Sequence, residues 1–254
     1  MNRSNPLRKG FAENRKLFGC WLQLPSSPIA EMMPLVGYDL LVIDMEHGPV
    51  ALSEAADMMR GIARTHAGAV VRIPANDPVF IKRFLDQGPD GIMIPMIETS
   101  GEAKDAVAAC RYPPRGKRGW AAGVARASLY GLDYDYTLQK ADHLVVVCQI
   151  ESVKAIDNIE EICAVEGIDV IFIGRNDLAA DSGHILNLDH PDMNRLAARV
   201  VTAAKRAGLK LGTVPSAGHG WAELFKDGFD IVLPSADISL LRDAARAEVA
   251  VFCH

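Results

Sequence analysis

The chain has 254 residues, 49% apolar and 23% charged, a composition typical of one soluble enzyme domain with a full core. A formal net charge of −5 argues against a nucleic-acid-binding protein, which would need a strongly basic face. No apolar run is long enough to cross a membrane, and the polar N-terminal extension, residues 1–16, lacks the apolar stretch of a signal peptide. The five cysteines include no CxxC pair, so we expect reduced thiols in a cytoplasmic protein.

Eight short apolar segments predict strands buried on both faces, as in a parallel sheet. In chain order they are residues 18–24, 39–44, 69–73, 91–95, 144–150, 169–174, 210–214 and 230–234. Amphipathic segments between them predict helices over residues 52–65, 101–110, 153–162, 192–207, 217–226 and 238–250, with a further helix opened by Asp77 and Pro78. The alternation predicts an α/β protein with a single domain over residues 1–254, a closed (β/α)8 TIM barrel. A doubly wound open sheet is the alternative, but no glycine fingerprint supports it.

Residues 111–133 form a long segment rich in Gly, Pro and Arg that shows no regular period. So long a loop in a compact domain usually has a function or covers an interface. An ordered but passive excursion of the chain explains the same composition, and both interpretations stay open at this point.

The polar residues that follow the predicted strands give the best clue to an active site, because β/α barrels place it at the carboxyl ends of the strands. His47 follows the second strand, Arg72 ends the third, Gln149 and Glu151 end the fifth, and Gly174, Asn176 and Asp177 follow the sixth. Gln149 and Glu151 share one side of their strand because side chains alternate. We therefore expect these groups to lie around one mouth of the barrel.

Glu151 and Asp177 are candidate ligands of a divalent metal. Two carboxylates about 4 Å apart repel by about 4 kcal/mol at an effective dielectric constant near 20, and a cation between them removes that cost. Few protein ligands, all of them oxygen, suit magnesium or manganese, with cobalt as a further possibility. The alternative is that these acids cap helices or form ion pairs.

His47 and Arg72 are candidate catalytic groups. A histidine exchanges protons near neutral pH, and Asp86 would orient its ring if the carboxylate reaches a ring nitrogen. The planar guanidinium of Arg72 suits a carboxylate or a developing enolate oxygen. Each residue also has a structural alternative. His47 would only form a hydrogen bond with a nearby loop, Asp86 would be an ordinary acid at a helix end, and Arg72 would form an ion pair with Asp44 or Glu46.

Other catalytic classes find little support in the sequence. There is no GxSxG motif for a serine hydrolase and no P-loop or GxGxxG motif after a strand. Lys210 begins a predicted strand and Lys82 lies in a helix, so neither is well placed for a Schiff base at a strand end.

Five segments resemble the HpcH/HpaI aldolase family, the class II pyruvate aldolases, and the resemblance runs from about Phe18 to near the C-terminus. They are DLLVIDMEHGP (39–49), VRIPANDPVFIKRFLDQGPDGIMIPMI (71–97), ACRYPPRGKRGWAAGVARAS (109–128), QIESVKAIDNIEEICAVEGIDVIFIGRNDLA (149–179) and GFDIVLPSADISLLR (228–242). The combination of EHGP with the QIE and IGxxDL motifs is specific to that family.

The resemblance implies an aldolase that cleaves a 4-hydroxy-2-oxo acid to pyruvate and an aldehyde through a metal-stabilised enolate. It implies Glu151 and Asp177 as metal ligands, Arg72 on the pyruvate oxygen, and His47 paired with Asp86 as the acid/base. It also implies that Gln149 and the backbone amides around Gly174, Asn176 and Asp177 hold the pyruvate carboxylate. A homo-hexamer, a trimer of dimers in which the last helix packs on a neighbouring subunit, is the implied assembly.

One departure from the family concerns the residues after the sixth strand, where a proline and a small residue are usual. Arg175 and Asn176 stand there, and residues 181–189 also differ from expectation. The arginine could narrow the site, add an anion contact or point outward. Decarboxylation of oxaloacetate, cleavage of an acyl-CoA thioester and non-catalytic binding of a 2-oxo acid remain as alternative functions. The aldehyde half of the substrate, whether derived from a sugar acid, a diacid of aromatic degradation or a short aldehyde, stays open.

Overall fold

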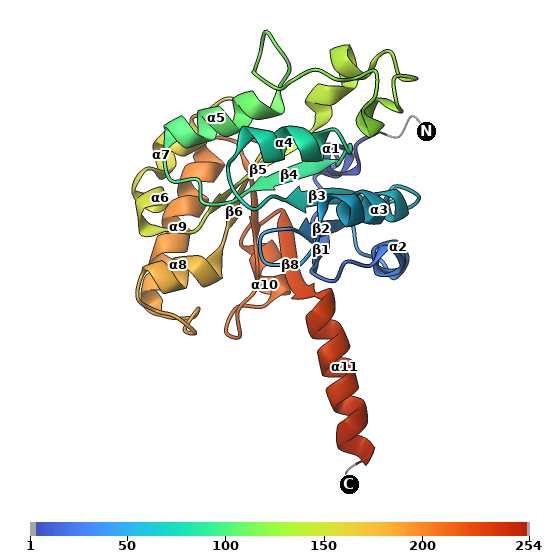
Figure 1. Ribbon diagram of the computed structural model, residues 1–254. Coiled ribbons are helices and arrows are strands. Elements are labelled where there is room, and N and C mark those ends of the chain that lie inside the picture. The colour runs from blue at the N-terminus through green and yellow to red at the C-terminus, as the bar shows by residue number, and fades with distance from the viewer. Residues whose placement is uncertain (1–3, 253–254) are drawn as a thin grey trace.

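The computed structural model describes residues 4–252 and contains a closed barrel of eight parallel strands (Figure 1). The strands are β1 Leu17–Leu22, β2 Leu40–Asp44, β3 Gly68–Arg72, β4 Gly91–Ile94, β5 Val145–Ile150, β6 Val170–Ile173, β7 Lys210–Thr213 and β8 Ile231–Ala236. Each strand pairs with the next along the chain, and β8 pairs with β1. The predicted (β/α)8 barrel is confirmed, and each predicted strand corresponds to an observed one.

Helices cover the outside of the barrel and connect successive strands (Figure 1). They are α2 Ser27–Leu35, α3 Leu52–Ile62, α4 Pro78–Leu85, α5 Ser100–Cys110, α6 Val153–Asp157, α7 Ile159–Cys163, α8 Arg175–Asp181, α9 Pro191–Arg206, α10 Trp221–Lys226 and α11 Asp237–Phe252. The helix predicted over residues 153–162 is interrupted at Asn158, and α10 begins later than predicted because Ser216 and His219 pair in a turn. Within residues 4–252, no helix combines the length and the apolar character that crossing a membrane would require.

Two apolar layers hold the barrel together. One fills the space between the strands and the outer helices, and the other fills the interior of the barrel. The interior layer takes alternate residues of each strand, such as Leu40 and Val42 on β2, or Val170 and Phe172 on β6. This alternation follows from strand geometry and decides which residues face the mouth further along each strand.

The N-terminal segment closes the amino end of the barrel. Helix α1, Pro6–Ala12, is capped by the side chain of Asn5 and buries Leu7 in the interior layer. A Cβ atom on Gly68 at the start of β3 would lie 2.7 Å from a methyl group of Leu7. The Leu7 side chain therefore fits against β3 because residue 68 is glycine. Arg8 forms an ion pair with Asp169, the residue that precedes β6. Part of the polar extension expected from the sequence is therefore a packed element.

The cysteines are placed as inert thiols. Cys20, Cys110, Cys148 and Cys163 are free and buried, and Cys253 lies outside the described residues. Burial raises the pKa of the Cys20 thiol, and likewise that of Cys110, to about 12, so neither carries a thiolate near neutral pH.

Candidate active site

The carboxyl ends of the strands surround a cavity of about 470 Å³. Side chains that alternate toward the barrel axis are apolar along most of each strand and polar at its carboxyl end. The polar ones are Asp44 on β2, Arg72 on β3 and Gln149 on β5. The cavity is lined by six of the predicted site residues, His47, Arg72, Gln149, Gly174, Asn176 and Asp177. The structure thus gathers these six groups at one mouth, whereas Glu151 does not line the cavity and is bonded to the lining residue Gln149.

Arg72 is held in a fixed orientation by a carboxylate on the neighbouring strand. Asp44 and Arg72 are paired in the β2–β3 register, and Nε and Nη2 of the arginine donate to the two carboxylate oxygens over 3.0 and 2.7 Å. The guanidinium also lies 4.3 Å from the centre of the Trp21 ring. Burial acts to raise the pKa of Asp44, but the hydrogen bonds and charge of Arg72 outweigh it and leave that pKa below its ordinary value. The ion pair considered as an alternative is present, and Arg72 still borders the cavity.

The same aspartate shapes the turn that carries His47. Its Oδ1 accepts hydrogen bonds from the backbone N–H groups of Glu46 and His47. A Cβ atom on Gly48 would lie 2.4 Å from the carbonyl oxygen of Asp44, so the turn requires glycine at this point. Glu46 Oε2 lies 3.1 Å from Arg72 Nη1, and burial raises the pKa of Glu46 despite that cation. The turn therefore presents the exposed His47 ring at the cavity, beside a network of acids around one arginine.

Asp86 is not part of this cluster, contrary to the expected pairing with His47. Helix α4 starts beyond the carboxyl end of β3 and runs back, so Asp86, its C-cap, lies at the amino end of the barrel. Four residues later, Asp90 bonds the backbone of Ala69 at the start of β3. The Asp86 carboxylate instead accepts a 2.9 Å hydrogen bond from Arg118, which comes from the long segment 111–133. Within one chain, Asp86 anchors that segment and does not orient the His47 ring.

Glu151 is a buried acid with an unusual electrostatic environment. Its Oε1 accepts a hydrogen bond from the Met96 amide over 2.8 Å, and its Oε2 accepts one from the Gln149 side chain. Burial raises the pKa of Glu151 to about 7, and the nearby charges of Glu46 and Asp177 add to that effect, while the two hydrogen bonds oppose it. Near neutral pH this carboxyl group is poised between its neutral and charged forms.

Gly174 leaves the space that the Glu151 and Gln149 side chains occupy. A Cβ atom on this glycine would lie 2.5 Å from Glu151 Oε2 and 3.0 Å from Gln149 Nε2. Helix α8 begins directly after it, with Asp177 in the first turn, exposed and bordering the cavity. Its neighbour Arg175 borders the cavity too, but its Nη2 donates to the carbonyl oxygen of Leu188 over 2.7 Å. The guanidinium therefore anchors the segment between α8 and α9.

The donor set at this end of the mouth fits a divalent cation. Among residues 4–252, neither Glu151 nor Asp177 forms an ion pair with a cationic side chain, and the negative charge of Asp177 acts to raise the pKa of Glu151. The Oε1 atom of Gln149 is buried and accepts no hydrogen bond. Two carboxylates without a cation, beside a further free oxygen, are the oxygen-rich arrangement that magnesium and manganese prefer.

Several residues of the mouth were not singled out as functional from the sequence. Gln23 follows β1, borders the cavity and donates to Asp44 Oδ2 over 3.0 Å. Asp237 at the start of α11 is buried and accepts the backbone N–H groups of Gln23 and Leu24. Gln23 has the same strand parity as Trp21, so the rule that found Arg72 and Gln149 could have found it.

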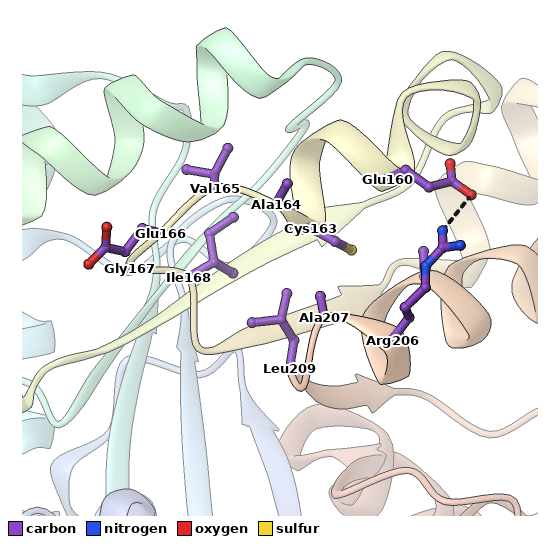
Figure 2. Close-up of a pocket in the computed structure, with 11 residues that line it drawn as sticks. Glu160, Cys163, Ala164, Val165, Glu166, Gly167, Ile168, Arg206, Ala207 and Leu209 are labelled. Carbon is purple, nitrogen blue, oxygen red and sulfur yellow. Dashed lines mark hydrogen bonds and ion pairs between the residues drawn. The ribbon is translucent and has the colours of Figure 1, made fainter.

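A second hollow lies at the opposite end of the barrel, and Figure 2 shows the residues that line it. It has a volume of about 500 Å³ and lies between α7 and the end of α9, with the Glu160–Arg206 ion pair at its edge. Burial raises the pKa of the Cys163 thiol in its wall to about 11. The thiol is therefore unreactive, and the hollow lies at the amino ends of β6 and β7. Because active sites of β/α barrels lie at the carboxyl ends of the strands, we assign the active site to the mouth and not to this hollow.

The fold and the site together define a class of protein: a (β/α)8 enzyme whose barrel mouth combines paired acids with an arginine and a histidine. The family model for "HpcH/HpaI aldolase/citrate lyase" matches residues 17–244. The chain belongs to this family, and its chemistry is that of an aldolase-type carbon–carbon lyase.

Individual relatives agree with that assignment. The chain is 37% identical over 227 residues to a 2-dehydro-3,6-dideoxy-6-sulfogluconate aldolase of Pseudomonas putida, covering 89% of each chain. It is 36% identical over 233 residues to a hydroxypyruvate/pyruvate aldolase of Chromohalobacter salexigens, covering 92% of each. A crystal structure of an HpcH/HpaI aldolase/citrate lyase family protein from Burkholderia cenocepacia J2315 superposes with a TM-score of 0.92 and 36% identity, covering 98% of this chain and 100% of that one.

Proposed function

We propose that this protein is a divalent-metal-dependent aldolase that cleaves a 4-hydroxy-2-oxo acid into pyruvate and an aldehyde. The observation that carries the proposal is the pair Glu151 and Asp177, which lies at the mouth of an aldolase-family barrel without a cationic partner among the described residues. Membership of this family supports the proposal, because the resemblance to class II pyruvate aldolases implies a divalent metal. Magnesium or manganese fits these oxygen donors best, and cobalt can substitute for them.

Glu151 and Asp177 would hold the cation. Its chemistry, when bound, is that of a Lewis acid that stabilises the enolate of a 2-oxo acid by several kcal/mol. The backbone amides at the start of α8 precede the first hydrogen bond within the helix, from Leu178 to Gly174, and are free to bind the substrate carboxylate with Gln149.

Arg72 and His47 supply the remaining chemistry. The guanidinium of Arg72 is fixed by Asp44 and borders the cavity, so it is preorganised to donate to the oxygen that gains negative charge as the carbon–carbon bond breaks. The exposed ring of His47 takes the proton of the substrate hydroxyl during cleavage and returns it in the reverse direction. Asp86 has no part in this scheme within a single chain, because it lies at the other end of the barrel.

A panel of 4-hydroxy-2-oxo acids, with pyruvate release followed with and without metal, tests the proposal. Treatment with a chelator should abolish turnover, and manganese or magnesium should restore it. Pyruvate alone should exchange its methyl protons with deuterated solvent, because that exchange needs the same enolate. Trapping of a pyruvate adduct by borohydride, or turnover that survives chelation, would contradict the proposal. Carbon dioxide release from oxaloacetate without an aldehyde product would identify a decarboxylase instead.

We also propose that the protein assembles as a homo-oligomer through α11, with the hexamer as the expected form. Helix α11 extends away from the barrel (Figure 1), and its only buried residue is Asp237. Its exposed large apolar side chains are Ile238, Leu240, Leu241, Val249, Val251 and Phe252. An isolated helix of this length is marginal in water, so its apolar side needs a partner surface, and a second copy of the chain supplies one. Sedimentation of the wild type and of Leu241→Glu should reveal an oligomer that the variant weakens; a monomeric wild type would contradict this.

A further inference from the structure

Gln23 is fixed in the wall of the cavity at both its backbone and its side chain. Its backbone N–H donates to the buried carboxylate of Asp237 over 2.9 Å, and its side-chain Nε2 donates to Asp44 Oδ2 over 3.0 Å. The pKa of Asp44 is lowered, so this carboxylate is charged near neutral pH and only accepts hydrogen bonds. The amide therefore presents its nitrogen to Asp44, and this fixes the position of its carbonyl oxygen Oε1.

The carbonyl oxygen of this amide is a free acceptor at the cavity. Among residues 4–252, no group donates a hydrogen bond to Gln23 Oε1, and the residue borders the cavity. The other cavity-lining residue of the β1 segment is Trp21, whose indole is a donor only. Gln23 is therefore the residue through which this side of the barrel offers a side-chain oxygen to a bound molecule.

Gln23 lies on the side of the mouth opposite the candidate metal ligands and next to His47. In the closed barrel, β1 is four strands from β5, the strand that Glu151 follows. The turn that carries His47 packs on Gln23, since a Cβ atom on Gly48 would lie 3.2 Å from both the Cα atom and the carbonyl oxygen of Gln23. A substrate whose pyruvate half is bound at β5 and the start of α8 therefore extends past His47 toward Gln23.

We propose that Gln23 selects the aldehyde half of the substrate by accepting a hydrogen bond at Oε1 from a hydroxyl group on C5. This inference rests on the aldolase function proposed above and adds to it a substrate class, the 4,5-dihydroxy-2-oxo acids. His47 takes the proton of the C4 hydroxyl, and the C5 substituent comes next along the chain toward Gln23. A substrate with a plain alkyl group at C5 leaves Oε1 without a donor and loses that hydrogen bond in the transition state.

Two substrates that differ in one hydroxyl test the inference. In the presence of manganese, 4,5-dihydroxy-2-oxopentanoate yields pyruvate and glycolaldehyde, whereas 4-hydroxy-2-oxopentanoate yields pyruvate and acetaldehyde. The quantity measured is the ratio of their kcat/KM values within one protein preparation. Gln23→Met keeps the length of the side chain but has no amide, and it should lower the ratio in favour of the dihydroxy acid by about 3- to 10-fold, the effect of one hydrogen bond. Gln139→Met, at an exposed glutamine outside the cavity, is the matched control and should retain the wild-type ratio.

The ratio separates recognition of the hydroxyl from a merely structural role of Gln23. Loss of the bond to Asp44 affects Arg72 and therefore both substrates alike, so the two kcat/KM values would fall together and the ratio would stay constant. An equal ratio in the wild type and Gln23→Met would overturn the inference and leave the aldolase function standing. Circular dichroism establishes that the variant folds, and Gln23→Leu is the second apolar variant if it does not. A wild type that releases no pyruvate from either compound would contradict the aldolase function and this inference with it.

Discussion

Replacing Glu151 by glutamine should stabilise the metal-free protein at alkaline pH while it removes function. Burial raises the pKa of this carboxyl from 4.5 to about 7, so the folded protein binds its proton more tightly than the unfolded chain does. Stability therefore decreases as pH rises between these two values, and the full loss is present above about pH 7. The difference corresponds to about 3 kcal/mol, at 1.36 kcal/mol for each pH unit. Glutamine is neutral and nearly isosteric, and so it avoids this loss.

The assay is urea unfolding of wild type and Glu151→Gln in the presence of a chelator, at about pH 5 and about pH 8.5. The variant should be more stable by up to about 3 kcal/mol at the higher pH and should differ little at the lower one. Glu166→Gln, at an exposed acid away from the mouth, is the control and should show no such pH dependence. Manganese at about 100 times its Kd should stabilise the wild type by about 2.7 kcal/mol and the variant much less. A difference independent of pH, or a less stable variant at pH 8.5, would refute the reasoning.

Three further substitutions test the geometry of the mouth. Gly174→Ala places a Cβ atom 2.5 Å from Glu151 Oε2, and this variant should lower kcat by about 100-fold and abolish manganese binding. The control is Gly123→Ala, whose Cβ atom would have no atom within 4 Å, and it should change neither kcat nor manganese binding. Arg72→Lys removes the two-pronged contact with buried Asp44; urea unfolding should show a loss of about 1–3 kcal/mol, and steady-state assays a lower kcat. His47→Gln should lower kcat/KM for cleavage by about 10²–10⁴-fold and leave pyruvate binding intact by calorimetry; unchanged kinetics would remove this ring from the mechanism.

Strand parity explains why so much of the mouth was predictable from the sequence. Once the apolar segments are assigned as strands, the alternation that buries Val145 and Val147 also turns Gln149 toward the barrel axis, with Glu151 following it. The prediction needs no knowledge of contacts between segments, because the barrel gathers every strand end at the same mouth.

The features that failed or were missed depend on contacts between distant segments. The pairing of Asp86 with His47 was implied by the family resemblance, but within one chain α4 carries Asp86 to the other end of the barrel, where Arg118 binds it. The sequence predicted only a polar extension over residues 1–16. A single buried side chain, Leu7, anchors this segment in the barrel interior, and one apolar residue gives no pattern in the sequence. Arg175 could have faced the substrate, and its bond to Leu188 depends on a segment whose path no local pattern predicts.

The charges at the mouth divide into two sets, and the division explains why the site needs an added cation. Asp44 and Glu46 both contact the guanidinium of Arg72, so the chain itself supplies a positive charge beside them, and for Asp44 that charge outweighs burial. Glu151 and Asp177 have no such partner among the described residues, and Arg175, two residues before Asp177, is directed to Leu188. Burying an acid without a partner raises its pKa and lowers stability, as the pKa of Glu151 demonstrates. The pair Glu151 and Asp177 therefore keeps a place for a divalent cation. Arg72, which contacts Asp44 and Glu46, also borders the cavity and can act on a substrate bound beside that cation.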